Sequence, residues 1–333
     1  MDKLYNKILN TIFIAPGIFL GVLFSQTLPK STPINTYSIV AYDKNTGELG
    51  VAVQSHWFSV GALVPWAKAG VGAVATQSFV KVEYGPEGLR RMESGQTAED
   101  VLKSLIDEDK GAEVRQVAMI DVKGSVAAYT GENCIYAAGH QIGKNYSVQA
   151  NLMEKESVWP AMAAAFEKTN GDLADKMMAS LEAAEKEGGD IRGMQSAAML
   201  IVSGEPTGIP WKDIVMDIRV DDHSTPLKEL KRLIRIHRAY QHANKGDYYL
   251  ELENINKALS EYEKATAFYP ENPELPYWSA VALTGQGNLK DALPIFSKVF
   301  KKEPRLKTLT PRLIDAGLLP NDKKILRKIM SVK

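Results

Sequence analysis

The sequence predicts an α+β protein that ends in an all-α helical region, and three patterns support this class. Pairs of runs rich in β-branched and apolar residues, each pair joined by a tight turn, predict two β-hairpins. Two helical patterns and a further strand follow the second hairpin, which is a layered α+β order rather than regular strand–helix alternation. After residue 222 no strand pattern occurs, and a 34-residue spacing begins.

The bulk composition is that of a folded protein of about two domains. The chain has 333 residues, of which 45% are hydrophobic and 24% charged, so disorder is not expected. The net charge is zero, which gives no global attraction to nucleic acid. Residues 298–333 hold eleven Lys or Arg against three Asp or Glu, a local charge of +8. This basic end is either a solvated helical face or a surface for an anionic partner or membrane.

The first 25 residues have the pattern of a secretory signal. Lys3 and Lys7 precede a mostly apolar run over residues 8–24, and a cut after Ser25 would leave Gln26 first. We therefore expect export to the periplasm or the medium. The alternative is an uncleaved anchor, because the run is near the lower length limit for spanning a membrane.

The strands are predicted from short apolar runs bounded by turn residues. The first hairpin joins residues 36–43 and 49–54 through residues 44–47. The second joins residues 115–121 and 125–130 through Lys123-Gly124. Residues 71–76 and 196–202 predict two further strands.

Helices are predicted between these strands. Thr97 followed by Asp100 is typical of a capping box and opens a helix toward residue 107. Residues 157–168 and 172–187 predict an antiparallel helical pair, and Pro226 opens a long amphipathic helix toward residue 243.

The C-terminal part contains an internal repeat. Four positions recur 34 residues later, which is the tetratricopeptide period: Ala258, Tyr262, Ala265 and Pro270 return as Ala292, Phe296, Val299 and Pro304. Two repeats seldom hold together alone, so we expect the helix from residue 227 and the segment from residue 309 to cap them. An unrelated helical bundle is the alternative.

Several motifs, in order, resemble one bacterial family. They are Thr36–Ala41 (TYSIVA), Gly61–Pro65 (GALVP), Ala69–Gln77 (AGVGAVATQ), Thr130-Gly131, Ala138–His140 (AGH), Ser147–Asn151 (SVQAN), Gly188–Gly193 (GGDIRG), Gln195–Ala198 (QSAA) and Arg219–His223 (RVDDH). This set is similar to the domain of unknown function 1028, which is grouped with the N-terminal-nucleophile hydrolases. Ala150 departs from the pattern, since a Gly is expected before Asn151.

The resemblance implies a four-layer αββα sandwich, in which two antiparallel sheets lie between helical layers. Together with the signal pattern and the repeat, the resemblance divides the chain into a signal peptide (1–25), a spacer (26–35), a hydrolase-like domain (36–237) and tetratricopeptide-like repeats (238–333).

The resemblance also implies amide hydrolysis by the residue at the head of the first strand, which is Thr36. A hydroxyl is a weak nucleophile without an adjacent base, and the α-amine of a chain-terminal Thr supplies that base. Because Thr36 is not terminal as encoded, a second cut before it is required. The alternative is an ordinary strand residue. We expect Thr36 to be an exposed strand-end side chain whose loss costs within about 0.5 kcal/mol.

Six other polar residues of these motifs, or beside them, are candidate site residues, and all except Gln195 have a structural alternative. Asn151 is a candidate oxyanion donor or a turn residue, and His56 is a candidate acid–base residue or a structural histidine. Gln77, Asp190, Arg192 and Gln195 are candidate substrate-binding residues; Gln77 could equally end its strand, and Asp190 and Arg192 could form a structural pair.

No cofactor or metal motif is found. Asp221-Asp222-His223 looks like a metal cluster, but it precedes Ser224-Thr225-Pro226, so we expect Asp222 and its neighbours to favour a helix N-terminus. Cys134, the single cysteine, can form no internal disulfide and is expected to be a small core residue rather than a nucleophile.

Two functions from different classes remain. The first is an exported amidohydrolase acting on a small N-acyl or N-carbamoyl compound. The second is a non-catalytic binding protein whose repeats engage a peptide or protein. We further expect a homo-oligomer and no nucleic-acid partner.

Overall fold

The structure, a computed structural model, describes residue 34 and residues 36–332. The predicted signal peptide and the spacer apart from Ile34 lie outside the described residues. Within the described part of the chain, no helix is both long enough and apolar enough to cross a membrane.

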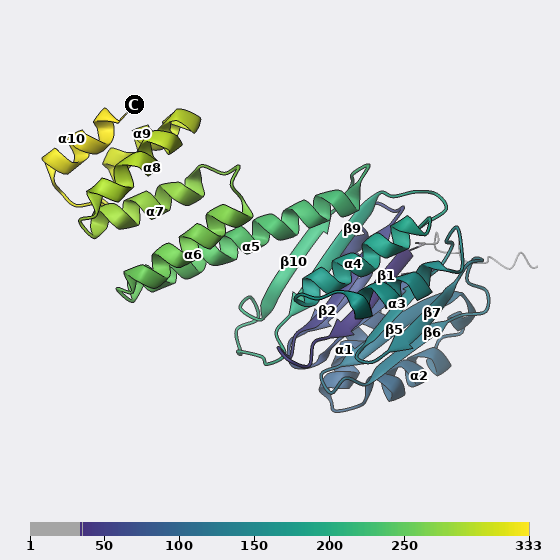
Figure 1. Cartoon of the computed structure of the whole chain (residues 1–333). Coiled ribbons are helices and arrows are strands. Elements are labelled where there is room, and N and C mark those ends of the chain that lie inside the picture. Colours follow the sequence, from purple (N-terminus) through teal and green to yellow (C-terminus); the bar gives the residue numbers. More distant parts are fainter. Residues whose placement is uncertain (1–33, 35, 333) are drawn as a thin grey trace, which may run out of the picture. The chain divides into compact units, whose positions relative to one another are not determined.

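In the described part of the chain, ten strands form two antiparallel sheets (Figure 1). The six-stranded sheet has the order β10-β9-β2-β1-β8-β7 and the four-stranded sheet the order β3-β4-β5-β6. The strands are β1 (Thr36–Tyr42), β2 (Leu49–Ser55), β3 (Pro65–Lys68), β4 (Gly72–Ser78), β5 (Arg115–Asp121), β6 (Val126–Thr130), β7 (Gly139–Gly143), β8 (Tyr146–Ala150), β9 (Ser196–Val202) and β10 (Ile214–Val220).

The first predicted hairpin is confirmed. β1 and β2 pair from Thr36↔Ser55 to Tyr42↔Leu49, across the turn that contains Gly47. Gly47 has φ +77°, a left-handed conformation that glycine adopts without steric cost. The second hairpin, β5 with β6, is confirmed as well.

The two sheets share an apolar core. Alternate residues of β1 and β2, such as Val40 and Val51, belong to the same buried cluster as Ala75 of β4 and Ala118 of β5. Because successive residues of a strand point to opposite faces, the intervening residues face the outer sides of the sheets.

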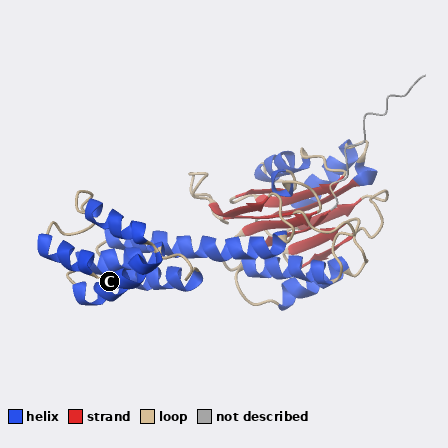
Figure 2. Cartoon of the chain, turned by 90° about the horizontal axis from the view of Figure 1, so that it is seen from above, coloured by secondary structure: helices blue, strands red, loops and turns tan. Residues whose placement is uncertain are grey.

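Helices cover those outer sides. Tyr37 and Ile39 of β1 belong to a cluster with α3 (Val158–Lys168) and α4 (Leu173–Lys186). Val117 and Met119 of β5 belong to one with α1 (Tyr84–Glu93) and α2 (Ala98–Glu108). Figure 2 shows the sheets stacked with helices on both sides. Two short 3₁₀ turns, η1 (Val60–Ala62) and η2 (Ala112–Val114), lie in connecting segments.

Beyond Val220 the described elements are all helical. They are α5 (Pro226–Glu251), α6 (Ile255–Phe268), α7 (Glu274–Gly285), α8 (Leu289–Lys302), α9 (Pro304–Leu309), the 3₁₀ turn η3 (Thr310–Leu313) and α10 (Lys323–Ser331).

The 34-residue spacing has a structural counterpart. α6 and α8 both contain 14 residues and start 34 residues apart, at Ile255 and Leu289. Their N-caps, Asn254 and Asn288, are also 34 residues apart, and each side chain accepts a hydrogen bond from the backbone N–H three residues on. Three of the four repeated positions are buried in each copy: Ala258, Tyr262 and Ala265 in α6, and Ala292, Phe296 and Val299 in α8. The fourth position, Pro270 and Pro304, is exposed.

The helix α5 is longer than predicted and runs through the predicted boundary between residues 237 and 238. Its first half contributes Leu227, Leu230 and Ile234 to the core beneath the six-stranded sheet. Its second half contributes Ala239 and Ala243 to a cluster with α6. The position of the domain boundary therefore stays a prediction.

Candidate active site

One end of the space between the two sheets is polar rather than apolar. Along β1 the residues that face the other sheet are Thr36 and Ser38, followed by the apolar Val40. At the same end lie Ser55 of β2, Gln77 of β4 and Gln116 of β5, all fully buried. Buried polar groups are stable only when hydrogen-bonded, and most of these side chains bond to one another.

Thr36 is the first residue of β1 and is fully buried. Its Oγ1 donates to the Ile34 carbonyl at 2.8 Å and lies 3.4 Å from Ser55 Oγ. The expectation of an exposed strand-end side chain was wrong, because β2 and β8 flank Thr36 and Ile34 lies ahead of it. Losing the buried hydrogen bond of Thr36 should lower the free energy of unfolding by about 0.5–1.5 kcal/mol, which is more than expected for an exposed side chain.

Gln77 and Asn151 both contact Thr36. The Thr36 carbonyl accepts from the backbone N–H of Asn151 at 3.1 Å and from Gln77 Nε2 at 3.2 Å. Asn151 Nδ2 lies 3.5 Å from the same oxygen. The structure thus brings together three residues that the sequence analysis selected from separate motifs.

Gln116 links these side chains, and the sequence analysis missed it. Its Oε1 accepts from Gln77 Nε2 at 2.6 Å and from Asn151 Nδ2 at 2.9 Å. The available signal was its position: Gln116 is a polar residue among the apolar inward positions of a predicted strand. Its partner Gln77 lies directly opposite on β4, and this pairing is a non-local property of the fold.

The network continues to His140. Gln116 Nε2 donates to Thr130 Oγ1 at 2.9 Å, and that oxygen lies 2.8 Å from His140 Nδ1. Either Thr130 Oγ1 or His140 Nδ1 can donate in this contact, because a hydroxyl group accepts up to two hydrogen bonds and donates one. Burial lowers the pKa of His140 below its ordinary value.

Thr130 and His140 line a cavity of about 490 Å³ that Cys134 also lines. The Cys134 thiol donates to the Arg115 carbonyl at 3.3 Å, and burial raises its pKa. A thiol with a raised pKa is a poor nucleophile at neutral pH, so a catalytic role for Cys134 has no support here. The side chain is only half-buried, not a full member of the core.

His56, Asp190 and Arg192 form a second group. The fully buried Asp190 carboxylate accepts from Arg192 Nε at 3.0 Å and from Arg192 NH2 at 2.8 Å. It also accepts from the backbone N–H of His56 at 3.3 Å. The structural Asp–Arg pair is therefore present. His56 Nδ1 is buried without a hydrogen-bond partner in the described part of the chain.

Gln195 contacts Ser55 of β2 and Asp222. Its backbone N–H donates to the Ser55 carbonyl at 3.1 Å, and its side-chain amide donates to Asp222 at 3.1 Å. Asp222 and its neighbours were expected to favour a helix N-terminus, and they directly precede α5. Asp222 itself bonds Gln195, whereas its neighbour His223 accepts at Nδ1 from the backbone N–H of Thr225, the N-cap of α5, at 3.0 Å. Among residues 34 and 36–332 no group of three or more His, Cys, Asp or Glu is placed to hold a metal ion.

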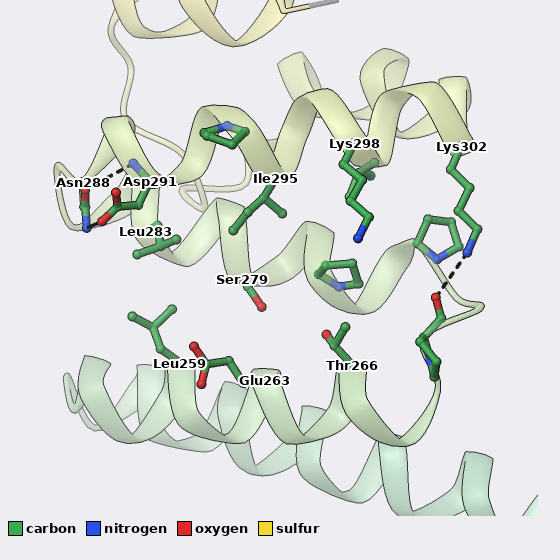
Figure 3. Close-up of a pocket in the computed structure, with 15 residues that line it drawn as sticks. Leu259, Glu263, Thr266, Ser279, Leu283, Asn288, Asp291, Ile295, Lys298 and Lys302 are labelled. Atoms are coloured by element: carbon green, nitrogen blue, oxygen red, sulfur yellow. Dashed lines mark hydrogen bonds between the residues drawn. The ribbon is translucent and has the colours of Figure 1, made fainter.

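A separate groove of about 770 Å³ lies between α6, α7 and α8 (Figure 3). Its lining is mainly apolar and includes four prolines, Pro270, Pro273, Pro276 and Pro294. Glu263 and Lys298 extend into it from opposite walls, with Ser279 between them (Figure 3). Lys302, at one end, donates to the carbonyls of Pro270 and Glu271.

These features define a class of protein: an α+β chain with two antiparallel sheets, a buried polar end around Thr36, and a helical C-terminal region. The family model described as "Family of unknown function (DUF1028)" matches residues 36–230, so the chain belongs to that family. A crystal structure of a DUF1028 protein from Silicibacter pomeroyi is similar, with 30% sequence identity and a TM-score of 0.55. The similarity covers 64% of this chain and 88% of that one. Comparison with curated proteins gave no match.

Proposed function

We propose that the protein is an exported amidohydrolase of the N-terminal-nucleophile type that uses Thr36 as its nucleophile. In this proposal the two sheets and their flanking helices are the four-layer αββα sandwich of that class. The observation that carries the proposal is the position of Thr36. It lies at the head of a central strand and at the buried polar end, in contact with Ser55, Gln77 and Asn151.

The chemistry requires a free amine. Removal of the predicted signal would leave residues 26–35 ahead of Thr36, so a second cut between Asn35 and Thr36 is needed. The α-amine then has an ordinary pKa of about 7.7–8.0, and its neutral form can take the hydroxyl proton near pH 7. While the chain is intact, that nitrogen is an amide and cannot act as a base.

Asn151 is the candidate oxyanion donor. Its side-chain amide is held by Gln116, 2.9 Å away, and lies 3.5 Å from the Thr36 carbonyl oxygen. A preorganised donor beside the nucleophile stabilises the charge that develops on a tetrahedral intermediate. In this scheme the substrate is a small N-acyl or N-carbamoyl compound. Arg192 is a weaker substrate-binding candidate than the sequence suggested, because Asp190 already engages its guanidinium.

Three variants test the proposal. Thr36→Ala should remove nearly all amide hydrolysis because the attacking oxygen is lost, whereas Thr36→Ser should retain part of it. Thr284→Ala is the matched control: Thr284 is also a buried threonine whose hydroxyl donates to a carbonyl at 2.8 Å, but it lies in α7. The control should lose stability and keep activity. Mass spectrometry of the active protein should show Thr36 as its first residue, and an active chain that begins at Gln26 would refute the mechanism.

The second candidate function is binding without catalysis, and the groove between α6, α7 and α8 favours it. We propose that these helices are tetratricopeptide repeats, on the strength of the 34-residue offset between α6 and α8 and of their matching Asn caps. A peptide or protein partner would then bind the helical region. Absence of amide hydrolysis by the protein that begins at Thr36, together with partner binding that Lys298→Glu abolishes, would favour this function.

A further inference from the structure

The strand edge beside Thr36 is occupied by Ile34, the second residue before the proposed cut. Ile34 and Ser78 form an antiparallel bridge: Ile34 N–H donates to the Ser78 carbonyl at 2.7 Å, and Ser78 N–H donates to the Ile34 carbonyl at 3.1 Å. The Ile34 side chain is only 2% exposed and belongs to the apolar cluster between the sheets. Hydrogen bonds therefore fix the backbone of Ile34, and apolar packing fixes its side chain.

This edge would otherwise be empty. β3 pairs with β4 only between Gly72 and Ala75, so it does not reach the end of β4. On its other side, Ser78 pairs with Arg115 of β5. Ile34 therefore takes the place of a neighbouring strand at Ser78, two residues ahead of the candidate nucleophile.

Ser78 has an unusual backbone for its residue type. It is fully buried and has φ +69°, in the left-handed region that non-glycine residues rarely adopt. Such conformations are strained and cluster at active sites and ligand-binding sites. Here it occurs at the residue whose N–H and carbonyl both bind Ile34.

We propose that the position of Ile34 is the acyl subsite of the enzyme, an inference that rests on the proposed function. Once the segment ahead of Thr36 has left, the subsite takes a peptide-like N-acyl group with a branched aliphatic side chain, one residue before the scissile carbonyl. The peptide group of that residue pairs with Ser78, and its side chain fills the apolar site that Ile34 vacates.

The atoms balance in the reaction that this subsite serves. Thr36 Oγ1 bonds to the acyl carbon, the carbon–nitrogen bond breaks, and the hydroxyl proton passes through the α-amine to the leaving nitrogen. Water then hydrolyses the ester, which releases the acid and restores the hydroxyl. No oxidant, reductant or other co-reactant is needed.

The subsite discriminates between substrate classes. When Ile34 leaves, the buried N–H and carbonyl of Ser78 lose their partners, and unpaired buried groups are unfavourable. A peptide-like group restores both hydrogen bonds. A formyl or carbamoyl group lacks both the extended backbone and the aliphatic side chain, so such compounds are poor substrates in this inference.

The test measures binding, without turnover, to the full chain carrying Thr36→Ala. The probe is acetyl-Ile-Asn-amide, which copies residues 34–35. Adding Ile34→Gly to this chain removes the side chain that fills the subsite, so the chain's own residue 34 competes less with the probe. The probe should therefore bind the double variant at least tenfold more tightly than the Thr36→Ala chain that keeps Ile34. Ile142→Gly is the control, because Ile142 lies on β7 and is 48% exposed. It should leave probe binding unchanged.

Two further probes test the separate parts of the subsite. Acetyl-Asp-Asn-amide lacks the aliphatic side chain, and the N-methyl-Ile probe lacks the N–H that donates to Ser78. Both should bind at least tenfold more weakly. Equal binding of the three probes, or equal binding to the chains with and without the Ile34→Gly substitution, overturns the inference.

A second measurement covers the case in which Ile34→Gly does not fold. Acetyl-Ile-Asn-amide should then inhibit the processed protein that begins at Thr36, and acetyl-Asp-Asn-amide should not; equal inhibition overturns the inference. The two proposals fail differently. If the protein hydrolyses amides but shows no preference for the Ile probe, the subsite proposal is wrong and Thr36 remains the nucleophile. If the chain binds the Ile probe specifically but hydrolyses no amide, the subsite proposal stands and the catalytic proposal is wrong.

Discussion

Gln116 and Gln54 are both fully buried glutamines, but their surroundings are opposite. The Gln116 side chain accepts from Gln77 and Asn151 and donates to Thr130 and to the carbonyls of Gly139 and Ala150. Neither polar atom of the Gln54 side chain has a hydrogen-bond partner among the described residues. The same residue type therefore contributes differently at the two positions.

This contrast predicts opposite effects for one substitution. Gln116→Leu should lower the free energy of unfolding by about 2–4 kcal/mol, because it leaves several buried partners unpaired. Gln54→Leu should be neutral or stabilising, since it removes a buried amide that bonds to nothing described. Urea unfolding of both variants measures the difference. Equal losses for the two variants would contradict the predicted difference.

His140 predicts a pH dependence of stability. Its pKa in the folded chain lies below the ordinary 6.5 because the ring is partly buried. Between these two values the unfolded chain binds a proton that the folded chain does not. The contribution of His140 to stability is therefore fully present above pH 6.5 and is lost as the pH falls toward the folded-state pKa.

His140→Gln should flatten this dependence while keeping an acceptor for Thr130. Urea midpoints at pH 7.5 and 5.5 should differ more for the wild type than for the variant. Glu132 and Glu156, which line the same cavity, are present in both proteins and cancel in the comparison. The same decrease in both proteins would assign the pH dependence to other groups.

At the scale of elements, the sequence predicts those whose signals are local. Thr97 and Asp172 act as N-caps, each accepting from the backbone N–H three residues on, and the helices they open were predicted within a few residues. The strands over residues 115–121 and 196–202 were predicted at their observed bounds. Local hydrophobic pattern and capping chemistry are sufficient for these elements.

Elements without a local pattern were missed. β3 has only four residues and begins with proline, and β7 (GHQIG) is a half-exposed edge strand without apolar alternation. Part of the site was missed for a related reason: Thr36, Gln77 and Asn151 were selected from motifs, whereas the role of Gln116 depends on the pairing of β4 with β5. Such contacts depend on tertiary structure, which one sequence does not reveal.

The matching caps of α6 and α8 give a prediction at this scale. Asn254→Ala and Asn288→Ala should each destabilise the helical region by about 1 kcal/mol, because each removes the acceptor for a helix N-terminal N–H. Asn244→Ala is the control, since Asn244 is an exposed position inside α5 where Ala favours the helix. It should be neutral or slightly stabilising. Thermal unfolding followed by circular dichroism measures all three, and a cap variant as stable as the control would contradict the repeat interpretation of α6 and α8.

At the scale of the whole chain, α5 belongs to the cores of both regions. With 26 residues it is about 39 Å long. His237 Nε2 lies 2.9 Å from the Val215 carbonyl of β10. Arg238 pairs with Asp172, the N-cap of α4, at 2.7 Å and with Asp175 of α4 at 2.9 Å. Further along, Gly246 lies against the Tyr262 ring of α6. The contacts to the sheet side thus extend beyond residue 237.

This arrangement predicts which fragment of the chain is stable. A fragment of residues 26–252 should unfold at a higher temperature than one of residues 26–237, because only the longer one keeps Arg238 beside Asp172 and the contact of Gln241 with the Val215 carbonyl. Asp172 and Asp175 are about half exposed, so we assign this ion-pair group only about 1 kcal/mol, which is a shift of about 2–4 °C for a fragment of this size.

Introducing Arg238→Gln into the longer fragment should remove most of this shift in melting temperature. Arg235→Gln is the control and should not remove it, because Arg235 pairs with Glu271 of the helical region. Equal melting temperatures for the two fragments would mean that the sheet side gains nothing from α5 beyond residue 237, and would place the boundary where the sequence predicted it.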